Sequence, residues 1–328
     1  MRHSTTALAA PLALFAAYSA AQPAPCAPAF PTGTSTLFIG HSFFMPVSER
    51  FNELAEAGDY PDHAFDNVGA GGASGSPLAL WNDPVDFDAI NTRLAQRDVD
   101  LLGMTAYDVF PGGDSDVEAY SNWIDLALAY NPDTSFFIGL PWVPTAPEQS
   151  LESFEQGLAV LNNRLFGTVD ALRRKYPGTR ILFANYGSAA YETVALYEAG
   201  GLPDAGCLLD CEDALFRDAR PGHAGPVITE LSAAVWMHTL YGADPSSLSL
   251  TVFVGDVVPV VEASIAYNAP YQTPPQDLER DGVLDLADID AFIGAFVGGE
   301  PEADFNADGV RDLRDITLFV GAFGNGCR

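Results

Sequence analysis

The chain has 328 residues, of which 44 are acidic and only 15 are lysine or arginine, so its net charge at pH 7 is −29. A charge of this sign repels the phosphate backbone of nucleic acids and excludes a nucleic-acid-binding protein. Hydrophobic residues make up 48% of the chain, which is enough to bury one large core and leave room for a smaller module.

The amino terminus has the layout of a cleavable secretory signal. A basic start is followed by an apolar Ala/Leu stretch and by small residues up to Ala21. We expect a signal peptide over residues 1–21, a linker over residues 22–34, and an exported protein that is secreted or attached to the cell surface. No stretch reaches the roughly 20 apolar residues that a membrane span needs, so none is expected.

Four cysteines in an exported chain indicate disulfide bonds. Cys207 and Cys211 are close enough in the sequence to bridge a single loop. Cys26 and Cys327 either pair across the termini or remain free, and the sequence does not decide between these alternatives.

Apolar runs of strand length alternate with helical patterns over residues 35–243. The predicted strands are 35–40, 64–68, 99–105, 134–140 and 180–185. The predicted helices are 47–57, 87–96, 117–130, 151–176, 189–199 and 225–240. This alternation is typical of a parallel sheet covered on both faces, so we expect an α/β fold, a three-layer α/β/α sandwich of the flavodoxin-like kind. The connecting segment 244–275 is poorly defined, and its apolar run 250–261 is compatible with one more strand.

A serine follows the first predicted strand directly. The apolar run from Leu37 to Ile39 ends at Gly40, and Ser42 stands between this strand and the helix predicted over 47–57. Open α/β sheets place their chemistry outside the carboxyl ends of their strands. Ser42 is therefore the candidate nucleophile.

A serine hydroxyl is a poor nucleophile without a base, and the chain contains five histidines. His223 lies in a Gly/Pro-rich loop just before the last helix of the main domain, from which it can reach back to the end of the first strand. Taken alone, such a histidine is more often a helix cap or a surface residue. Asp218 is the nearest acid and can orient the imidazole if the turn at Pro221 and Gly222 bulges the loop; a Ser-His dyad is the alternative.

Two calcium-type loops follow one another near the carboxyl terminus. Each places oxygen side chains at positions 1, 3, 5, 9 and 12 and a glycine at position 6, and the peptide carbonyl of position 7 completes the set. The candidate ligands of the first loop are Asp277, Glu279, Asp281, Val283, Asp285 and Asp288. The candidate ligands of the second loop are Asp304, Asn306, Asp308, Val310, Asp312 and Asp315. The two loops start 27 residues apart and run into similar predicted helices at 289–296 and 316–323, so they form an internal repeat. The alternative is a pair of acidic helix caps without metal.

These loops resemble dockerin type I modules, in which position 12 is Asp, as it is at Asp288 and Asp315. The resemblance covers residues 276–328 and implies a small all-α module, a structural Ca²⁺ in each loop and a cohesin-like protein partner. Similar repeats also occur as terminal modules with no known partner. Glu279 stands where Asp or Asn is usual, so we expect the first loop to bind calcium more weakly than the second.

Residues 35–242 resemble the SGNH, or GDSL-like, hydrolase family. Gly40, His41 and Ser42 stand at the place of its Gly-Asp-Ser block, Gly72 at the place of its oxyanion glycine, and His223 at the place of its late catalytic histidine. The resemblance implies that Ser42 attacks an ester carbonyl and that His223 takes its proton. It further implies that the backbone amides of Ser42 and Gly72 stabilise the oxyanion.

Three positions depart from the family pattern. His41 replaces its aspartate, and the amide donor of the third block is missing, so Thr105 or Tyr107 would have to replace that donor. Loss of one oxyanion donor typically costs about 2.7–4 kcal/mol of transition-state stabilisation. Arg220 stands where the family's orienting acid is expected, which leaves that role to Asp218.

Together these patterns predict an exported serine esterase that removes acetyl or other short acyl groups from polysaccharides or glycosides. We expect it to need no cofactor for catalysis. Trp142 and Tyr107 are the candidate substrate-binding residues, although tryptophan more often packs in a core. One alternative is a catalytically degenerate SGNH fold that serves as a carbohydrate-binding or cell-surface module. The other is a lipase or thioesterase acting on longer acyl chains, with an apolar lid formed by Phe43, Phe44 and Met45.

Overall fold

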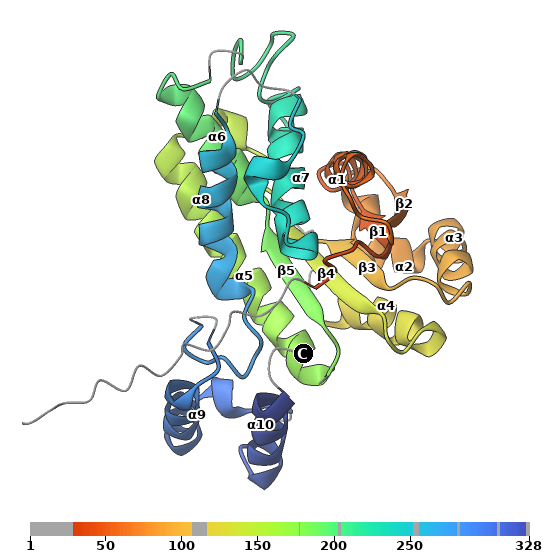
Figure 1. The fold of residues 1–328 in the computed structure, drawn as a ribbon, viewed down its shortest axis with the longest axis vertical. Helices are drawn as coiled ribbons and strands as arrows, with labels where there is room; N and C mark the ends of the chain where they lie inside the picture. Colours follow the sequence, from red (N-terminus) through yellow and green to blue (C-terminus); the bar gives the residue numbers. More distant parts are fainter. Residues whose placement is uncertain are drawn as a thin grey trace, which may run out of the picture.

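A parallel five-stranded sheet forms the centre of the molecule (Figure 1). The computed structural model describes residues 29–106, 117–176, 178–202, 205–251, 256–280, 283–306 and 309–325. The strands are β1 (Ser35–Gly40), β2 (Ala64–Gly69), β3 (Leu101–Thr105), β4 (Ser135–Leu140) and β5 (Ile181–Asn185). The expected α/β class is confirmed, and each predicted strand is present with its ends displaced by at most a few residues.

The strand order is β2-β1-β3-β4-β5, and every neighbouring pair is parallel. The chain therefore winds outward from β1 in one direction to β2 and in the other direction to β3. In such doubly wound sheets a crevice opens at the carboxyl ends of the strands where the winding direction reverses. The residues that follow β1 lie at this switch point.

Alternate side chains of the central strands enter two separate hydrophobic cores. On β1, Phe38 belongs to one core, whereas Leu37 and Ile39 belong to the other. All three are fully buried, as expected for a strand that is covered on both faces. The molecule is thus a three-layer α/β/α sandwich.

Helices cover both faces of the sheet (Figure 1). The first core lies under α1 (Met45–Ala57), α6 (Gly187–Glu198), α7 (Pro226–Tyr241) and α8 (Val258–Asn268). The second core lies under α2 (Pro77–Asn82), α3 (Pro84–Leu94) and α4 (Val117–Tyr130). The long helix α5 (Leu151–Lys175) contributes side chains to both cores.

The further strand considered over residues 250–261 is contradicted over its last residues, 258–261. Residues 252–255 lie outside the described part of the chain, and from Val258 onward the backbone forms α8. Its buried residues, Val260, Val261, Ser264 and Asn268, follow the spacing of one helix face, which packs against α6 and α7. A short valine-rich run fits a strand or a buried helix equally well, and here tertiary packing selects the helix.

A disulfide bond joins Cys207 to Cys211, as the sequence predicts. The chain then folds back toward this disulfide, where Leu215 N donates a hydrogen bond to Cys207 O at 3.1 Å. Cys26 and Cys327 lie outside the described residues, as do residues 1–21 of the expected signal peptide.

The carboxyl-terminal part of the chain forms two helices, α9 (Leu286–Gly298) and α10 (Leu313–Asn325), with a small core of their own. Phe292 and Phe319 occupy equivalent positions 27 residues apart, and their rings stack with centroids 4.0 Å apart. We call residues 276–325 the two-helix module. Arg280 connects it to α5 through an ion pair with Asp170 at 3.2 Å and through its position over the ring of Phe166.

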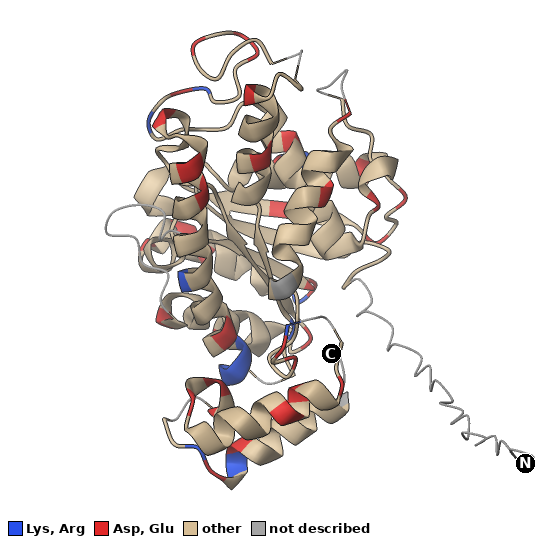
Figure 2. Cartoon of the chain, turned by 90° about the vertical axis from the view of Figure 1, so that its left-hand side faces the viewer, with Lys and Arg blue, Asp and Glu red and all other residues tan. Residues whose placement is uncertain are grey.

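The charge of the chain is spread over its surface elements rather than gathered at one point. Figure 2 shows acidic residues on helices and loops of both the sandwich and the two-helix module, with few basic residues between them. Within the described ranges, no helix combines the length and the apolar character required to cross a membrane.

Candidate active site

Ser42 lies in the tight turn that joins β1 to α1. The turn is closed by His41 O, which accepts hydrogen bonds from Phe44 N at 2.8 Å and Met45 N at 3.0 Å. Gly40 is required before it, because a Cβ at this position would approach the Phe44 ring to 2.7 Å. The backbone N–H of Ser42 makes no hydrogen bond with any described residue and remains available to a ligand.

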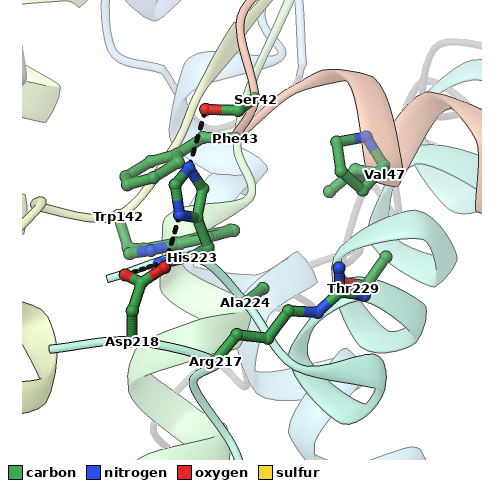
Figure 3. Close-up of a pocket in the computed structure, with 10 residues that line it drawn as sticks. Ser42, Phe43, Val47, Trp142, Arg217, Asp218, His223, Ala224 and Thr229 are labelled. Carbon is green, nitrogen blue, oxygen red and sulfur yellow. Dashed lines mark hydrogen bonds and ion pairs between the residues drawn. The ribbon is translucent and has the colours of Figure 1, made fainter. Parts of the chain in front are cut away.

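The structure brings Ser42, His223 and Asp218 together, although Ser42 and His223 are 181 residues apart in the sequence (Figure 3). Ser42 Oγ lies 2.9 Å from His223 Nε2, and His223 Nδ1 lies 2.7 Å from Asp218 Oδ2. Because Nδ1–H donates to the carboxylate, Nε2 is left as the acceptor for the serine hydroxyl. This is the hydrogen-bond order of a Ser-His-Asp triad.

The loop before α7 makes the five-residue spacing between Asp218 and His223 workable. Asp218 Oδ1 accepts hydrogen bonds from Gly222 N at 2.8 Å and His223 N at 3.1 Å, so the carboxylate closes the loop that carries its own partner. Gly222 has φ +80°, a conformation that favours glycine. This turn at Gly222 brings Asp218 and His223 into contact across five residues.

Asp218 is held in its ionised form. Partial burial raises the pKa of its carboxyl group, but the hydrogen bonds from the His223 side chain and from the His223 and Gly222 amides together outweigh that effect. The net result is a pKa below the ordinary value for aspartate. A charged carboxylate is the form that can orient the imidazole and stabilise its protonated state.

Thr105 is not placed to stabilise an oxyanion. Its side chain is fully buried, and its hydroxyl lies 3.1 Å from His41 Nε2 rather than in the pocket. His41 Nε2 also lies 2.9 Å from Ala106 O, while His41 Nδ1 accepts a hydrogen bond from Phe43 N at 3.2 Å. The buried imidazole therefore connects the turn that carries Ser42 to the end of β3, and Thr105 belongs to this connection.

Gly72 lies in a short 3-10 turn (Gly72–Gly75) that packs against the Ser42 turn. The close approach is at Gly75, where a Cβ would come within 2.6 Å of both Gly40 O and His41 Cα. Gly72 itself has φ +58° and open space around it, and it does not line the pocket beside Ser42. Tyr107, the second candidate donor, lies outside the described residues.

A pocket of about 290 Å³ opens beside Ser42 and His223. Its lining residues are Ser42, Phe43, Pro46, Val47, Trp142, Arg217, Asp218, His223, Ala224 and Thr229. Trp142, the predicted substrate-binding residue, lines the pocket, but its side chain is almost fully buried. Its indole stacks on Phe43 and donates a hydrogen bond to Gly222 O at 2.8 Å. Trp142 is therefore a wall of the pocket and a support of the histidine loop rather than an exposed platform.

Arg217 and Thr229 also line this pocket, and the sequence alone does not mark them as site residues. Thr229 lies in the first turn of α7, and Arg217 directly precedes Asp218 in the chain. Proximity to the acid was the one available signal for Arg217, and nothing in its own residue type marks it as a pocket residue.

The two predicted calcium loops share one hydrogen-bond pattern. In the first loop, Asp288 accepts from Glu279 N at 3.3 Å and Asp285 N at 2.9 Å. In the second loop, Asp315 accepts from Asn306 N at 3.2 Å and Asp312 N at 2.8 Å, which are the equivalent residues. Each position-12 carboxylate thus spans its loop from position 3 to position 9.

The remaining predicted ligands differ in burial. Asp277, Asp288, Asp304 and Asp315 are buried, whereas Val310 is exposed. Asp281 and Asp308, at position 5 of each loop, lie outside the described residues. In the part of the chain that is described, no three His, Cys, Asp or Glu side chains are close enough together to hold a metal ion. Calcium prefers hard oxygen donors such as the carboxylates of these loops. The hydrogen-bond pattern that the two loops share is compatible with one such site in each loop.

Comparison with known proteins places this chain in no family. No family model matches it, and no curated protein is significantly similar to it. Among solved structures, the periplasmic domain of a Salmonella ser. Paratyphi A lipopolysaccharide acetyltransferase aligns with a TM-score of 0.37 and 12% identity, over 65% of this chain and 84% of that one. A similarity this distant assigns no function to the chain.

Proposed function

We propose that the protein is an exported serine esterase that hydrolyses short acyl esters of carbohydrates. The hydrogen-bonded series Ser42, His223 and Asp218 at the mouth of a pocket carries this proposal. The order of the sheet supports it, because the residues that follow β1 lie at the switch point where such sheets bind their ligands. The motifs that resemble SGNH hydrolases support it as well, because they place the nucleophile at Ser42, directly after β1.

The proposed reaction uses each group for one task. Ser42 Oγ adds to the ester carbonyl while His223 Nε2 takes its proton, and the imidazole returns that proton to the departing alcohol. Water then releases the acyl group by the same route. The free amide of Ser42 is one donor for the oxyanion. Gly72 does not line the pocket, but it lies in the turn that packs against the Ser42 turn, and its amide is proposed as the second donor.

The pocket favours short acyl groups over long ones. Its volume of about 290 Å³ is at the lower limit of ligand pockets in general. Phe43 and Phe44 are fully buried, so they form part of the core rather than an apolar lid, and Met45 is half-buried at the start of α1. Neither observation supports a lipase or a thioesterase for long chains.

Covalent labelling tests the proposal directly. A serine-directed fluorophosphonate should modify the mature protein at Ser42, identified by peptide mass spectrometry, and should not modify Ser42→Ala. Ser74, an exposed serine in the neighbouring turn, supplies the matched control, because Ser74→Ala should be labelled like the wild type. The rate constant kcat/KM should fall along a series of nitrophenyl esters from acetate to octanoate; a rise would favour the lipase.

A catalytically degenerate fold that only binds carbohydrate is the second candidate. The observation in its favour is the buried hydroxyl of Thr105, which contacts His41 and leaves the oxyanion site with one donor fewer than the SGNH pattern implies. Folded protein that is inert toward the fluorophosphonate, yet binds an acetylated polysaccharide, would establish this candidate in place of the esterase.

For the two-helix module we propose a calcium-stabilised docking function with a cohesin-like partner, as its resemblance to dockerins implies. Its equivalent positions repeat on the surface as well as in the core: Leu286 and Leu313 are exposed, and so are Ile293 and Val320. Exposed aliphatic side chains on both helices are suited to a protein interface. Loss of binding to a cohesin when calcium is chelated would support this role, and calcium-independent binding would oppose it.

A further inference from the structure

Arg217 gives the pocket a positive charge in a strongly acidic protein. Its side chain is exposed and lines the same pocket as Ser42 and His223. In Figure 3 it extends from the loop that carries Asp218 toward Thr229, and lies across the pocket from Phe43 and Trp142. A substrate bound at Ser42 would therefore meet a guanidinium group on one wall.

The Arg217 guanidinium has no hydrogen-bond or ion-pair partner among the residues that the structure describes. Five other described arginines each form an ion pair with a carboxylate: Arg50, Arg93, Arg173, Arg220 and Arg280. Arg217 has no carboxylate of the described residues within 4.0 Å, although the chain contains 44 acidic residues. Arg220, three residues away in the same loop, is paired with Glu148 at 2.7 Å.

The backbone of Arg217 is fixed relative to the reacting groups. Its N–H donates to His223 O at 2.8 Å, and an antiparallel bridge joins the flanking residues Phe216 and Ala224. The next residue, Asp218, accepts a hydrogen bond from His223 Nδ1 and so holds the imidazole ring. The turn that positions the imidazole therefore also fixes the point from which the Arg217 side chain extends.

The rest of that wall offers little to an anion. Pro46 and Val47 at the start of α1 are apolar, and the Thr229 hydroxyl donates to Gly225 O at 2.9 Å. Asp218 is negative and already bonded to His223. Arg217 is thus the permanent cation of the pocket, and its planar guanidinium is suited to paired hydrogen bonds with a carboxylate.

We propose that Arg217 selects esters that carry a carboxylate close to the ester bond. This inference rests on the proposed esterase function of Ser42. The carboxylate belongs either to the alcohol half, as in an acylated uronate, or to the acyl half, as in a half-ester of a dicarboxylic acid. During turnover Ser42 Oγ displaces the alcohol, which leaves with the proton from His223, and Arg217 stays protonated throughout.

Two pairs of isosteric esters test the proposal and separate the two sources. The alcohol half is probed with para-acetoxybenzoate against para-acetoxybenzamide, and the acyl half with phenyl hemisuccinate against phenyl levulinate. The measured quantity is the preference, defined as kcat/KM for the carboxylate ester divided by kcat/KM for its neutral isostere. Spontaneous hydrolysis is subtracted with Ser42→Ala protein.

We expect a preference above one in the pair that matches the natural source, and a decrease of about tenfold in Arg217→Met, as for a hydrogen bond to a charged group. Arg217→Lys should retain part of the preference, and Arg220→Met, the matched control, should leave it unchanged. High salt should reduce the preference of the wild type, because the guanidinium is exposed to solvent. No preference in either pair, or the same preference in Arg217→Met as in the wild type, would overturn the proposal.

A binding measurement keeps this test independent of catalysis. In calorimetric titrations, the Ser42→Ala protein should bind the preferred carboxylate ester more tightly than its neutral isostere. The double variant that carries both Ser42→Ala and Arg217→Met should bind the two esters equally. Equal binding of both esters would overturn the anion site even in an active esterase. If this difference in binding is found but the wild type hydrolyses no ester, the esterase is wrong and the anion site stands.

Discussion

Asp218 shows how a residue in an unexpected position can take a familiar role. It stands five residues before His223, and its two carboxylate oxygens are used differently. Oδ1 accepts the amides of Gly222 and His223, whereas Oδ2 accepts His223 Nδ1–H. The same side chain therefore shapes the loop and fixes the tautomer of the histidine.

Because the two oxygens of Asp218 have separate hydrogen-bonding roles, the variant Asp218→Asn distinguishes between them. Its amide oxygen can still accept the two backbone N–H groups, but its NH₂ group would then face His223 Nδ1 and favour the tautomer that cannot accept the Ser42 proton. We expect kcat to fall by about a thousandfold or more while the fold is retained. Nitrophenyl acetate hydrolysis measures kcat, and circular dichroism shows whether the fold is retained. Asp213→Asn in the neighbouring exposed loop is the control. Activity close to that of the wild type would show that Asp218 does not orient the base.

His41 is a buried histidine with a structural task. Burial lowers its pKa from 6.5 to about 4, more strongly than the hydrogen bond to Ala106 raises it. The neutral ring can accept from Phe43 N at Nδ1 and donate from Nε2 at the same time. A protonated ring would lose the acceptor that holds the turn beside Ser42.

Protonation of His41 therefore links stability to pH. Between pH 6.5 and about 4 the unfolded state binds a proton at this residue and the folded state does not, so acidification favours unfolding. From about pH 7.5 to about pH 5 this residue should cost about 2 kcal/mol of unfolding free energy. His41→Gln retains a donor near Ala106 O and should lose correspondingly less stability over that range. Urea unfolding at both pH values measures this, and equal losses in the two proteins would contradict the role assigned to His41.

At the scale of elements, the pattern of apolar residues was sufficient to predict the five strands of the sheet. β1 lies between Thr34 and His41, and β4 lies between Thr134 and Pro141. Both strands are buried on both faces, so their lengths could be read from the sequence. The sequence does not predict the short helix α2, because a single apolar turn gives too little periodicity. It leaves the start of α8 compatible with a strand, because the valines there fit either structure.

The candidate site was predictable where chemistry restricts the residue type. Ser42 directly follows β1, and His223 lies in the loop before α7, where a nucleophile and its base could be expected. The fold places them within hydrogen-bond distance. The contact of Thr105 with buried His41 could not be foreseen, since it depends on which way one hydroxyl turns at the end of β3. Arg217 was missed because an exposed arginine is ordinarily a surface residue, and only the closure of the loop places it in the pocket.

The turn at Gly72–Gly75 supports the nucleophile by direct contact, which predicts a difference between two glycines. Gly75→Ala places a Cβ within 2.6 Å of His41 Cα and Gly40 O, both backbone atoms that cannot move without shifting Ser42. We expect a loss of about 2 kcal/mol in unfolding free energy and a decrease in kcat. Gly71→Ala is the matched control, because its φ of −75° suits alanine and nothing lies within 4 Å of the new Cβ. Equal stability of the two variants in urea unfolding would refute this packing.

At the scale of the whole molecule, the chain combines an α/β sandwich with a two-helix module built from a repeat. The repeat is visible at every level: in the loop sequences, in the carboxylate pattern of Asp288 and Asp315, and in the stacked pair Phe292 and Phe319. Arg280, within the first loop, contacts Asp170 and Phe166 of α5. The loop thus joins the repeat to the sandwich.

Calcium binding would stabilise the two-helix module, because an ion that binds only the folded loops shifts the unfolding equilibrium. Chelation should lower the melting temperature of this module in the full protein, and added calcium should restore it. Asp315→Asn should weaken the response, whereas Asp290→Asn, an exposed acid on α9 outside the loops, should leave it unchanged. Scanning calorimetry measures these shifts, and no change on adding calcium to the chelated protein would exclude the metal.

The most direct test of the esterase is the hydrolysis of nitrophenyl acetate and of an acetylated xylan by the mature protein, Ser42→Ala and His223→Ala. Ser42 Oγ and His223 Nε2 are 2.9 Å apart and act as one unit in the proposed reaction, so either substitution should abolish turnover. Turnover by the wild type and by neither variant is the predicted result. Activity that survives in Ser42→Ala, or its absence from all three proteins when each is folded, would contradict a serine esterase.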